Sequence, residues 1–398
     1  MSSALLNERS NSGIVDIEAL ARPTLDERSR QGFCSALRRH AIRDMVEDLR
    51  NDFSQNVDGR SGQHCRDARE IAQAMRTRPS FKFYSSVRYN VQEMCFQSVQ
   101  PQIERALPQM IDTARDAAAS SPAGGSLRLN PYLEVPRYVT AVDVHLTPGC
   151  FHSEWTEDDV AQGAVVGLGS RVFAANMNHR MFGGVAKVIS RWIKASYPTF
   201  RPRRILDIGT SSGKNLLPYV EAFPGIEAYG VDVGAPLLRY GHAVAEHEGI
   251  PVHFSQQNAE AMDFEDGFFD LIVSSFFFHE IPVKSTRNVL SECYRLLSPK
   301  GLMAHQELPA TNLVDAWEDY FWNWDTKNNN EPSYTAFRAE DPIALCAKAG
   351  FNKERSFAKI LPDISAYPDR ATEFAWDEPG RPMHGRGGWY VFGAWKSV

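Results

Sequence analysis

From Arg204 onward, short runs rich in β-branched residues alternate with runs whose apolar residues recur at helical spacing. Such alternation is typical of parallel strands joined by helices that cover both faces of one sheet. Strands are predicted at residues 203–209, 227–233, 252–258, 269–275 and 301–307, with helices at 215–223, 236–249 and 285–297 between them. Two later strand-like runs, 352–360 and 387–398, complete the prediction of a doubly wound, mainly parallel, seven-stranded sheet.

The first half of the chain has a different pattern. Residues 22–119 show apolar residues at three- and four-residue spacing, which predicts a set of helices. A small, flexible stretch, SSPAGGS at 120–126, is the best candidate for a linker. The expected organisation is a helical N-terminal region (1–125), an irregular connecting and cap segment (126–200), and a second domain (201–398) with an aromatic insertion at 311–340.

Charge, hydropathy and cysteine usage exclude several classes of partner. A formal net charge of −6 disfavours nucleic acid, which requires a basic surface. The longest apolar run, FFDLIVSSFFF, is far shorter than the ~20 residues that span a bilayer. The N-terminus, MSSALLNERSNSG, lacks the pattern of a secretory signal. The six cysteines are widely spaced with no CxxC pair, which predicts reduced thiols, a cytoplasmic protein and no metal site.

The loop after the first predicted strand, DIGTSSGKN, narrows the choice of ligand. A P-loop has four residues between its glycines and a hydroxyl residue after the Lys, whereas three residues separate Gly209 from Gly213 here and Asn215 follows the Lys. A dinucleotide site prefers a third glycine, and an NAD(P)-binding oxidoreductase remains an alternative. Asp207 would repel a phosphate, but it suits the positive ammonium and sulfonium of a cofactor with an amino-acid end.

With the motifs that follow it, this loop resembles the D-x-G-x-G-x-G motif of the class I S-adenosylmethionine-dependent methyltransferases, which have a Rossmann-like fold. Ser211 replaces the central glycine of that motif. Further along, Asp232 of GVDV stands where the family binds the ribose hydroxyls, and Asn258 of QQNAEAMDF stands beside the adenine. The resemblance covers about residues 180–310. It implies S-adenosyl-L-methionine as cofactor, bound by Asp207, Gly209, Ser211, Gly213, Asp232, Val233, Asn258, Ala259, Ser274 and Ser275.

Three residues are candidates for catalysis: His279, Glu280 and His305. Histidine is a suitable base for a hydroxyl or amine acceptor because its pKa lies near neutral pH. His279 in FFFHEIP follows the fourth strand, at the ligand-binding edge of such sheets, and resembles in position the base of plant-type small-molecule O-methyltransferases. Glu280 could orient His279 or complement a helix dipole. His305 and Glu307 share a strand face, and a purely structural role is the alternative for every one of these residues.

Aromatic residues outside the matched segment are expected to build the acceptor pocket. Those of Trp317–Phe337 either form a wall of the pocket or fill the core against the N-terminal region. In the family that this chain resembles, the segment before the first motif often folds over the cofactor. Tyr138, Arg180 and Phe182 are therefore candidate contacts. The N-terminal helices are expected to close the pocket, to form a homodimer, or both.

These features predict a methyltransferase that modifies an oxygen or nitrogen of a small apolar or aromatic metabolite, as in secondary metabolism, with no nucleic-acid or membrane partner. Carbon methylation stays open, because it requires mainly positioning of the acceptor. Two alternatives also bind S-adenosylmethionine: a cyclase that uses the sulfonium electrostatically, and a partner subunit that transfers no methyl group.

Overall fold

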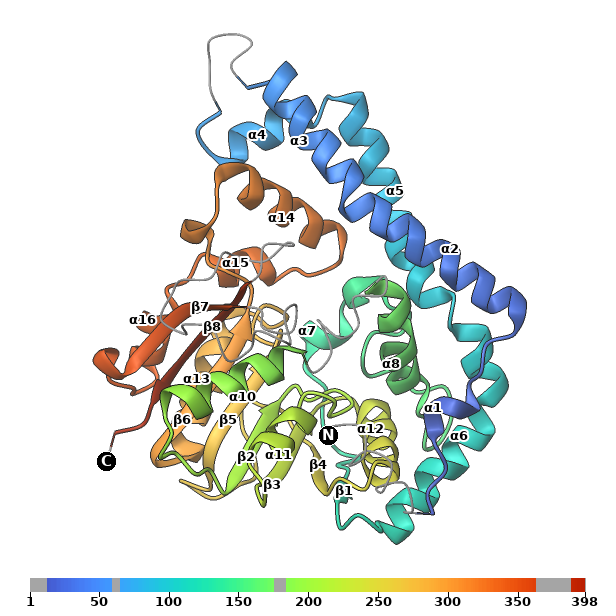
Figure 1. Ribbon diagram of the computed structural model, residues 1–398, viewed down its shortest axis with the longest axis vertical. Helices are drawn as coiled ribbons and strands as arrows, with labels where there is room; N and C mark the ends of the chain where they lie inside the picture. The colour runs from blue at the N-terminus through green and yellow to red at the C-terminus, as the bar shows by residue number, and fades with distance from the viewer. Residues whose placement is uncertain (1–12, 59–64, 175–183, 363–387, 398) are drawn as a thin grey trace.

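The computed structural model describes residues 13–58, 65–174, 184–362 and 388–397. Within these residues the strands form one eight-stranded sheet, in the order β1-β4-β3-β2-β5-β6-β8-β7 (Figure 1). The strands are β1 (Ser126–Arg128), β2 (Arg204–Ile208), β3 (Glu227–Asp232), β4 (Val252–Gln256), β5 (Phe269–Ser275), β6 (Leu297–Glu307), β7 (Ser356–Pro362) and β8 (Gly388–Trp395). Neighbouring strands run parallel from β1 to β6, whereas β8 is antiparallel to both β6 and β7.

The predicted doubly wound, mainly parallel sheet is confirmed, but it has eight strands and not seven. The additional strand is β1, which begins at the last residue of the expected linker and pairs Leu127 with Phe254 of β4. Three residues at a sheet edge are too few to show an alternating pattern in the sequence, so periodicity could not reveal this strand.

Helices cover both faces of the sheet, as the alternation predicts. On one face lie α10 (Gly184–Ser196), α11 (Leu217–Ala222) and α12 (Ala235–His247), whose apolar residues share a core cluster with β2, β5 and β6. On the other face lie α13 (Val283–Leu296) and α16 (Pro342–Lys348), which share a second cluster with the opposite side of the same strands. A parallel sheet needs this double cover because both of its faces are apolar.

The N-terminal region is helical, as expected, and runs along one side of the sheet domain (Figure 1). Its helices are α1 (Ile17–Leu20), α2 (Leu25–Ile42), α3 (Asp44–Asn56), α4 (Ala68–Met75), α5 (Pro79–Gln97) and α6 (Gln100–Ser120). A capping box between Thr24 and Glu27 fixes the start of α2. Helices α2, α5 and α6 pack with α8 (Ala161–Phe173) and α12 around a third apolar cluster, so the N-terminal region and the sheet domain share a core.

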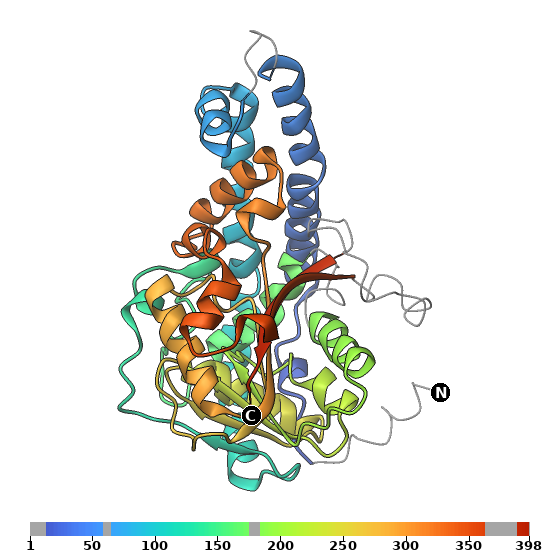
Figure 2. The same ribbon diagram turned by 90° about the vertical axis from the view of Figure 1, so that its left-hand side faces the viewer.

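The aromatic insertion forms α14 (Ala316–Asn328) and α15 (Tyr334–Arg338), which begin beyond the end of β6. Figure 2 shows α14 rising beside the N-terminal helices, away from the sheet. The two interpretations of its aromatic residues both hold in part. Trp317 is buried against Phe53 of α3, with 5.0 Å between ring centroids, and belongs to a fourth apolar cluster. Phe321 and Trp322 line a cavity instead.

The remaining described helices are short. They are α7 (Arg137–Thr140) and the 3₁₀ turns η1 (Val144–Leu146), η2 (Thr311–Leu313) and η3 (Lys353–Arg355). Among the described residues, no helix combines the length and the hydropathy that crossing a bilayer would require. No cluster of three or more metal-ligating side chains occurs among them either.

Candidate active site

A large cavity, of about 860 Å³, lies at the carboxyl ends of β2, β3 and β5. This volume is within the range of ~300–1,000 Å³ that is usual for small-molecule sites. Its walls include Arg38, Tyr84 and Arg88 of α2 and α5; Tyr138, His145 and Phe173 of the connecting segment; Gly209, Asp232 and Glu280 at the sheet edge; and Phe321, Trp322 and Asp325 of α14. The expected cofactor loop and the N-terminal helices therefore face one space.

The loop after β2 turns sharply through three residues in the left-handed region: Gly209 at φ 65°, Ser211 at 52° and Gly213 at 73°. At Gly209 any side chain would be excluded, since a Cβ atom would lie 2.4 Å from Cδ2 of Phe277. Ser211 adopts its angle without the freedom of glycine, which strains the backbone at the position where the resembling motif has its central glycine.

Asp232 ends β3 with its carboxylate held in place. One oxygen accepts a hydrogen bond from the backbone N–H of Ser211 and the other from that of Gly234, each at 2.9 Å. Burial raises the pKa of Asp232, and these backbone bonds partly offset the effect. The carboxylate links the loop after β2 to the end of β3 and lines the cavity, where its remaining lone pairs can accept hydrogen bonds from a diol.

Not every predicted cofactor residue reaches the cavity. Val233, Asn258, Ala259 and Ser275 line it together with Gly209, Ser211 and Asp232, whereas Asp207, Gly213 and Ser274 do not. Asp207 is fully buried beneath the loop and accepts a hydrogen bond from the Thr210 hydroxyl at 2.8 Å. Burial raises its pKa to about 7. The structure thus places Asp207 where it shapes the loop, and gives it no direct face toward the ammonium of a cofactor.

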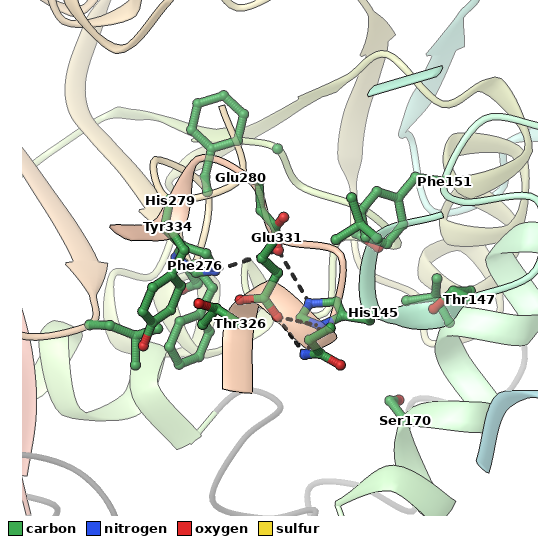
Figure 3. A pocket seen from close by; sticks show the side chains of 18 of the residues that line it. His145, Thr147, Phe151, Ser170, Phe276, His279, Glu280, Thr326, Glu331 and Tyr334 are labelled. Carbon is green, nitrogen blue, oxygen red and sulfur yellow. Dashed lines mark hydrogen bonds and ion pairs between the residues drawn. The ribbon is translucent and has the colours of Figure 1, made fainter. Parts of the chain in front are cut away.

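A series of acidic and imidazole side chains reaches the cavity wall, where its members His279, Glu280, His145 and Glu331 are labelled in Figure 3. It begins at Glu307, whose carboxylate lies 2.6 Å from His279 Nδ1. The other ring nitrogen of His279 lies 3.4 Å from Glu280 Oε1, and the same oxygen lies 3.2 Å from His145 Nε2. His145 Nδ1 lies 2.9 Å from Glu331 Oε1. Three carboxylates and two imidazoles therefore alternate in one continuous series of contacts.

The alternation raises the pKa of both imidazoles, which favours their charged form. Burial alone would lower the pKa of His145, but the charge of Glu331 and hydrogen bonds to Glu280 and Glu331 outweigh it and raise that pKa to about 10. The same balance, with Glu307 as the main partner, raises the pKa of His279 well above its ordinary value. Burial would raise the pKa of Glu280, but hydrogen bonds from the two histidines lower it to about 2.

One carboxylate oxygen of Glu280 has no hydrogen-bond partner among the described residues. Its Oε1 atom serves both histidines, while the buried Oε2 atom has no hydrogen-bond partner among the described residues. An unpartnered carboxylate oxygen is costly to bury, so a donor is expected to complete the site. Both ring nitrogens of His279 already face carboxylates. Glu280, and not His279, therefore has free acceptor capacity, and its side chain lines the cavity.

His305 lies outside the cavity. Its ring is fully buried between those of Phe278 and Phe392, at centroid distances of 4.9 and 5.4 Å, and Nδ1 lies 2.9 Å from the Ser274 hydroxyl. Burial lowers the pKa of His305 to about 3, which keeps it neutral. The candidate catalytic residue His305 is thus buried in the sheet and does not line the cavity.

Two residues of this series of charged side chains, His145 and Glu331, were not predicted from the sequence. His145 lies in an irregular segment, at φ 57°, and its backbone N–H donates to the carbonyl of Asn329 at 2.8 Å. Glu331 follows an Asn run in the insertion. Both segments are rich in aromatic residues, which predicted a pocket there, but this pattern does not indicate which polar residues line that pocket. Tyr138 does line the cavity, with its hydroxyl donating to Glu260 at 3.0 Å, whereas the candidates Arg180 and Phe182 lie outside the described residues.

Comparison with known proteins bears on the sheet domain. Residues 205–301 match the family model described as "Methyltransferase domain". Over 108 residues the chain is 36% identical to the demethylmenaquinone methyltransferase of Thermus thermophilus, an alignment that covers 27% of this chain and 48% of the relative. Over 128 residues it is 30% identical to the ubiquinone/menaquinone biosynthesis C-methyltransferase of Pectobacterium atrosepticum, covering 31% and 50%. The chain thus spans about half the length of these curated relatives.

Among solved structures, a candidate O-methyltransferase from Nostoc punctiforme is 16% identical, with a TM-score of 0.42 over 90% of this chain and 96% of that one. A phosphoethanolamine N-methyltransferase of Haemonchus contortus is 17% identical, with a TM-score of 0.38 over 55% and 54%. On the family match, residues 205–301 are a class I methyltransferase domain of the S-adenosylmethionine-binding family.

Proposed function

We propose that this protein transfers a methyl group from S-adenosylmethionine to an oxygen or nitrogen of a small apolar or aromatic acceptor. The observation that carries the proposal is the single cavity in which Asp232 and Glu280 both take part. Asp232 stands at the end of a strand of the matched domain, and Glu280, which has an unpartnered buried oxygen, lines the same cavity. A transfer reaction needs such a shared, enclosed site for its two reactants.

The residues at the sheet edge fit the cofactor. The Asp232 carboxylate, held by the backbone N–H of Ser211, lines the cavity and suits a ribose diol. The bound cofactor would supply an electrophilic methyl group on a positively charged sulfonium. The contacts from Glu307 to Glu331 join three carboxylates to two imidazoles, a group of charges that favours a cation beside it.

Glu280 is the residue that we assign to the acceptor. Its Oε2 atom would accept a hydrogen bond from the O–H or N–H group that is to be methylated, and so direct the acceptor's lone pair. With a pKa of about 2, Glu280 is a weak base, and it takes the proton only as alkylation makes the acceptor acidic. His279 and Glu307 act through Glu280 as positioning residues, which revises the expectation that His279 is itself the base.

Carbon methylation is the second candidate function. Curated relatives with 30% identity are named as C-methyltransferases of quinone biosynthesis, although the chain covers only half of their length. In that reaction the role of Glu280 would be to hold an acceptor hydroxyl and not the reacting atom. A cyclase or a subunit that transfers no methyl remains the alternative, and neither explains the unpartnered oxygen better. Nothing in the described residues favours an NAD(P) enzyme.

The N-terminal helices would close the cavity, since α2 and α5 contribute Arg38, Tyr84 and Arg88 to its wall. A homodimer through the same helices remains a prediction, to be tested by sedimentation. We also propose a cytoplasmic location, because all six cysteines are free thiols.

The test is calorimetric titration with S-adenosylhomocysteine, with NADH and ATP as competing ligands. We expect micromolar binding of S-adenosylhomocysteine alone. Asp232→Ala should weaken it by about 1–3 kcal/mol, because charged hydrogen bonds to the ribose are lost. Asp263→Ala, which removes an exposed carboxylate outside the cavity, is the matched control. Tighter binding of NADH or ATP, or unchanged affinity of the Asp232 variant, contradicts the proposal.

Methyl transfer itself is tested with candidate aromatic and apolar acceptors. Formation of S-adenosylhomocysteine together with a methylated product supports the proposal. Conversion of an acceptor without S-adenosylhomocysteine formation identifies a cyclase instead.

A further inference from the structure

Arg38 is a buried cation without an acidic partner. Its side chain, on α2, is 6% exposed and lines the cavity. The guanidinium stacks over the ring of Phe173, 3.6 Å from its centroid, and Nε donates to the carbonyl of the same residue at 2.6 Å. The buried Nη1 atom has no hydrogen-bond partner among the described residues. One face and one edge of the group are thus fixed, and one donor is left open.

Asp325, the carboxylate that acts on Arg38, is already paired with another arginine. Asp325 of α14 pairs with Arg88 of α5, at 2.8 Å from Nε and 2.9 Å from Nη2, in a two-point contact. The third nitrogen of Arg88 donates to Gln92 at 2.8 Å. Arg88 lowers the pKa of Arg38 and Asp325 raises it, so the charges of this pair act on Arg38 in opposite directions. Arg38, Arg88 and Asp325 together therefore carry a net charge of about +1.

The charge persists at neutral pH. Burial lowers the pKa of Arg38, and Arg88 lowers it further, to about 9. Two charged guanidinium groups therefore stand at this end of the cavity in the absence of any ligand.

A second open donor stands nearby. Tyr84 precedes Arg88 by one turn of α5, is fully buried and lines the cavity. Its hydroxyl has no hydrogen-bond partner among the described residues. Charge interactions between Tyr84 and both arginines show that the three groups are neighbours. A buried cation and a buried hydroxyl that both lack acceptors cost several kcal/mol when left unpaired, and such groups usually mark a ligand.

We propose that Arg38 and Tyr84 bind a carboxylate of the acceptor, so that the substrate is a small aromatic or apolar acid. This inference rests on the proposed methyl transfer and names its substrate class. A carboxylate brings one negative charge, which neutralises the net charge at this end, whereas a phosphate dianion would leave an excess. Two oxygens also match the two open donors, the Arg38 Nη1 and the Tyr84 hydroxyl.

The same geometry orients the acceptor. Phe173 separates the two polar parts of the site, with Arg38 on its face and the His145 ring 6.2 Å from its centroid. The aromatic ring gives a flat apolar body a surface to lie on. A substrate with its acid group at Arg38 would then direct its other end toward the Glu280–His145 pair, where the methyl acceptor is expected.

The probes are three carboxylates, benzoate, phenylacetate and naphthoate, with their primary amides as neutral matches and phenyl phosphate as the dianion. Each is titrated into protein saturated with S-adenosylhomocysteine. We expect at least one carboxylate to bind at least tenfold more tightly than its amide. Arg38→Met should reduce that binding roughly 10- to 100-fold, and Tyr84→Phe by a smaller factor. Arg115→Met, which removes an arginine of an exposed ion pair outside the cavity, should change nothing.

Affinity for S-adenosylhomocysteine and the unfolding midpoint are measured for every variant, so loss of the fold is distinguished from loss of the acid site. Arg38→Lys keeps the charge and serves as the second variant if Arg38→Met is unstable; it should retain part of the carboxylate preference. Equal binding of acids and amides, no binding of any probe, or a preference that survives Arg38→Met overturns the inference. Because S-adenosylhomocysteine binding is scored separately, the inference can fail while the proposed methyl transfer stands. Preference for phenyl phosphate would also overturn it.

Discussion

The Nδ1 atom of His279 lies 2.6 Å from the carboxylate of Glu307, and both side chains are almost completely buried. His279 follows β5 and Glu307 ends β6, so two adjacent parallel strands bring the pair together. The second oxygen of Glu307 accepts a hydrogen bond from the backbone N–H of Phe278 at 2.6 Å, which fixes the carboxylate in turn. His279 is thereby held with its remaining nitrogen toward Glu280.

Glu307→Gln should lower turnover roughly 10- to 100-fold with little change in KM. The amide has no charge to keep His279 protonated, so His279 would hold Glu280 less firmly in the orientation that the reaction requires. Turnover is measured as S-adenosylhomocysteine formed with an acceptor that the unsubstituted protein methylates. Glu248→Gln, an exposed residue at the end of α12, is the control. Equal turnover in both variants would remove Glu307 from the mechanism.

The stability of the protein should fall as pH rises from about 6.5 toward 10. His145 has a pKa of about 10 in the folded protein against an ordinary 6.5, so between these values the folded state binds more protons than the unfolded state. Its contribution is complete below 6.5 and is lost toward 10, by at most about 1.4 kcal/mol per pH unit for one histidine. Glu280, lowered to about 2 from 4.5, loses its contribution only as pH falls through that interval.

Urea unfolding at several pH values checks this dependence. His145→Gln should make the free energy of unfolding fall less steeply between pH 6.5 and 10 than it does in the unsubstituted protein. Identical slopes for the variant and the unsubstituted protein would mean that His145 is not charged in the folded protein.

Ser211→Gly should raise the free energy of unfolding by up to about 1 kcal/mol. The serine has φ 52°, and a left-handed backbone costs a residue with a side chain more than it costs glycine. Ser291→Gly, on the exposed face of α13, should have the opposite sign, a loss of about 0.5 kcal/mol, because glycine is the poorer helix former. A loss of stability at both positions would show that Ser211 is unstrained.

Arg88→Met and Asp325→Asn should each destabilise the protein by about 3–5 kcal/mol, since each leaves one charge of a buried pair uncompensated. The double variant should lose much less than the sum, because the two charges of the pair are removed together. Chemical denaturation of the four proteins gives the coupling energy. The exposed pair Arg128 and Asp263 is the comparison, and coupling no larger than theirs would contradict a buried, mutually dependent pair.

The sheet domain was predictable because its pattern is local. Each strand is a short apolar run, and the loop from Asp207 to Gly213 follows the first of them directly. Even there, spacing alone did not predict which side chains line the cavity. Asp207 and His305 stand at strand ends, but their side chains are buried away from the cavity, and orientation depends on contacts such as the Thr210 hydroxyl that no local pattern specifies.

The acceptor side was not predictable for the same reason. His145, Glu280 and Glu331 come from three segments that meet only in the folded chain, and two of those segments are irregular. In the sequence, Arg38 cannot be distinguished from other basic residues on helices. Only the fold brings Phe173 of α8 against its guanidinium. Sequence patterns report periodic burial, and a site built from single residues of distant loops and helices has no period.

The shared core of α6, α8 and α12 has a consequence for the order of folding during synthesis. Helix α6 ends at Ser120, and its partner α12 is complete only at His247. At a synthesis rate of about 5–20 residues per second, roughly 10 s pass between the synthesis of α6 and the synthesis of its partner α12. During this interval the apolar surface of the N-terminal helices is exposed to the ribosome surface and to chaperones. Translation speed between residues 120 and 247 should therefore influence the fraction of protein that folds.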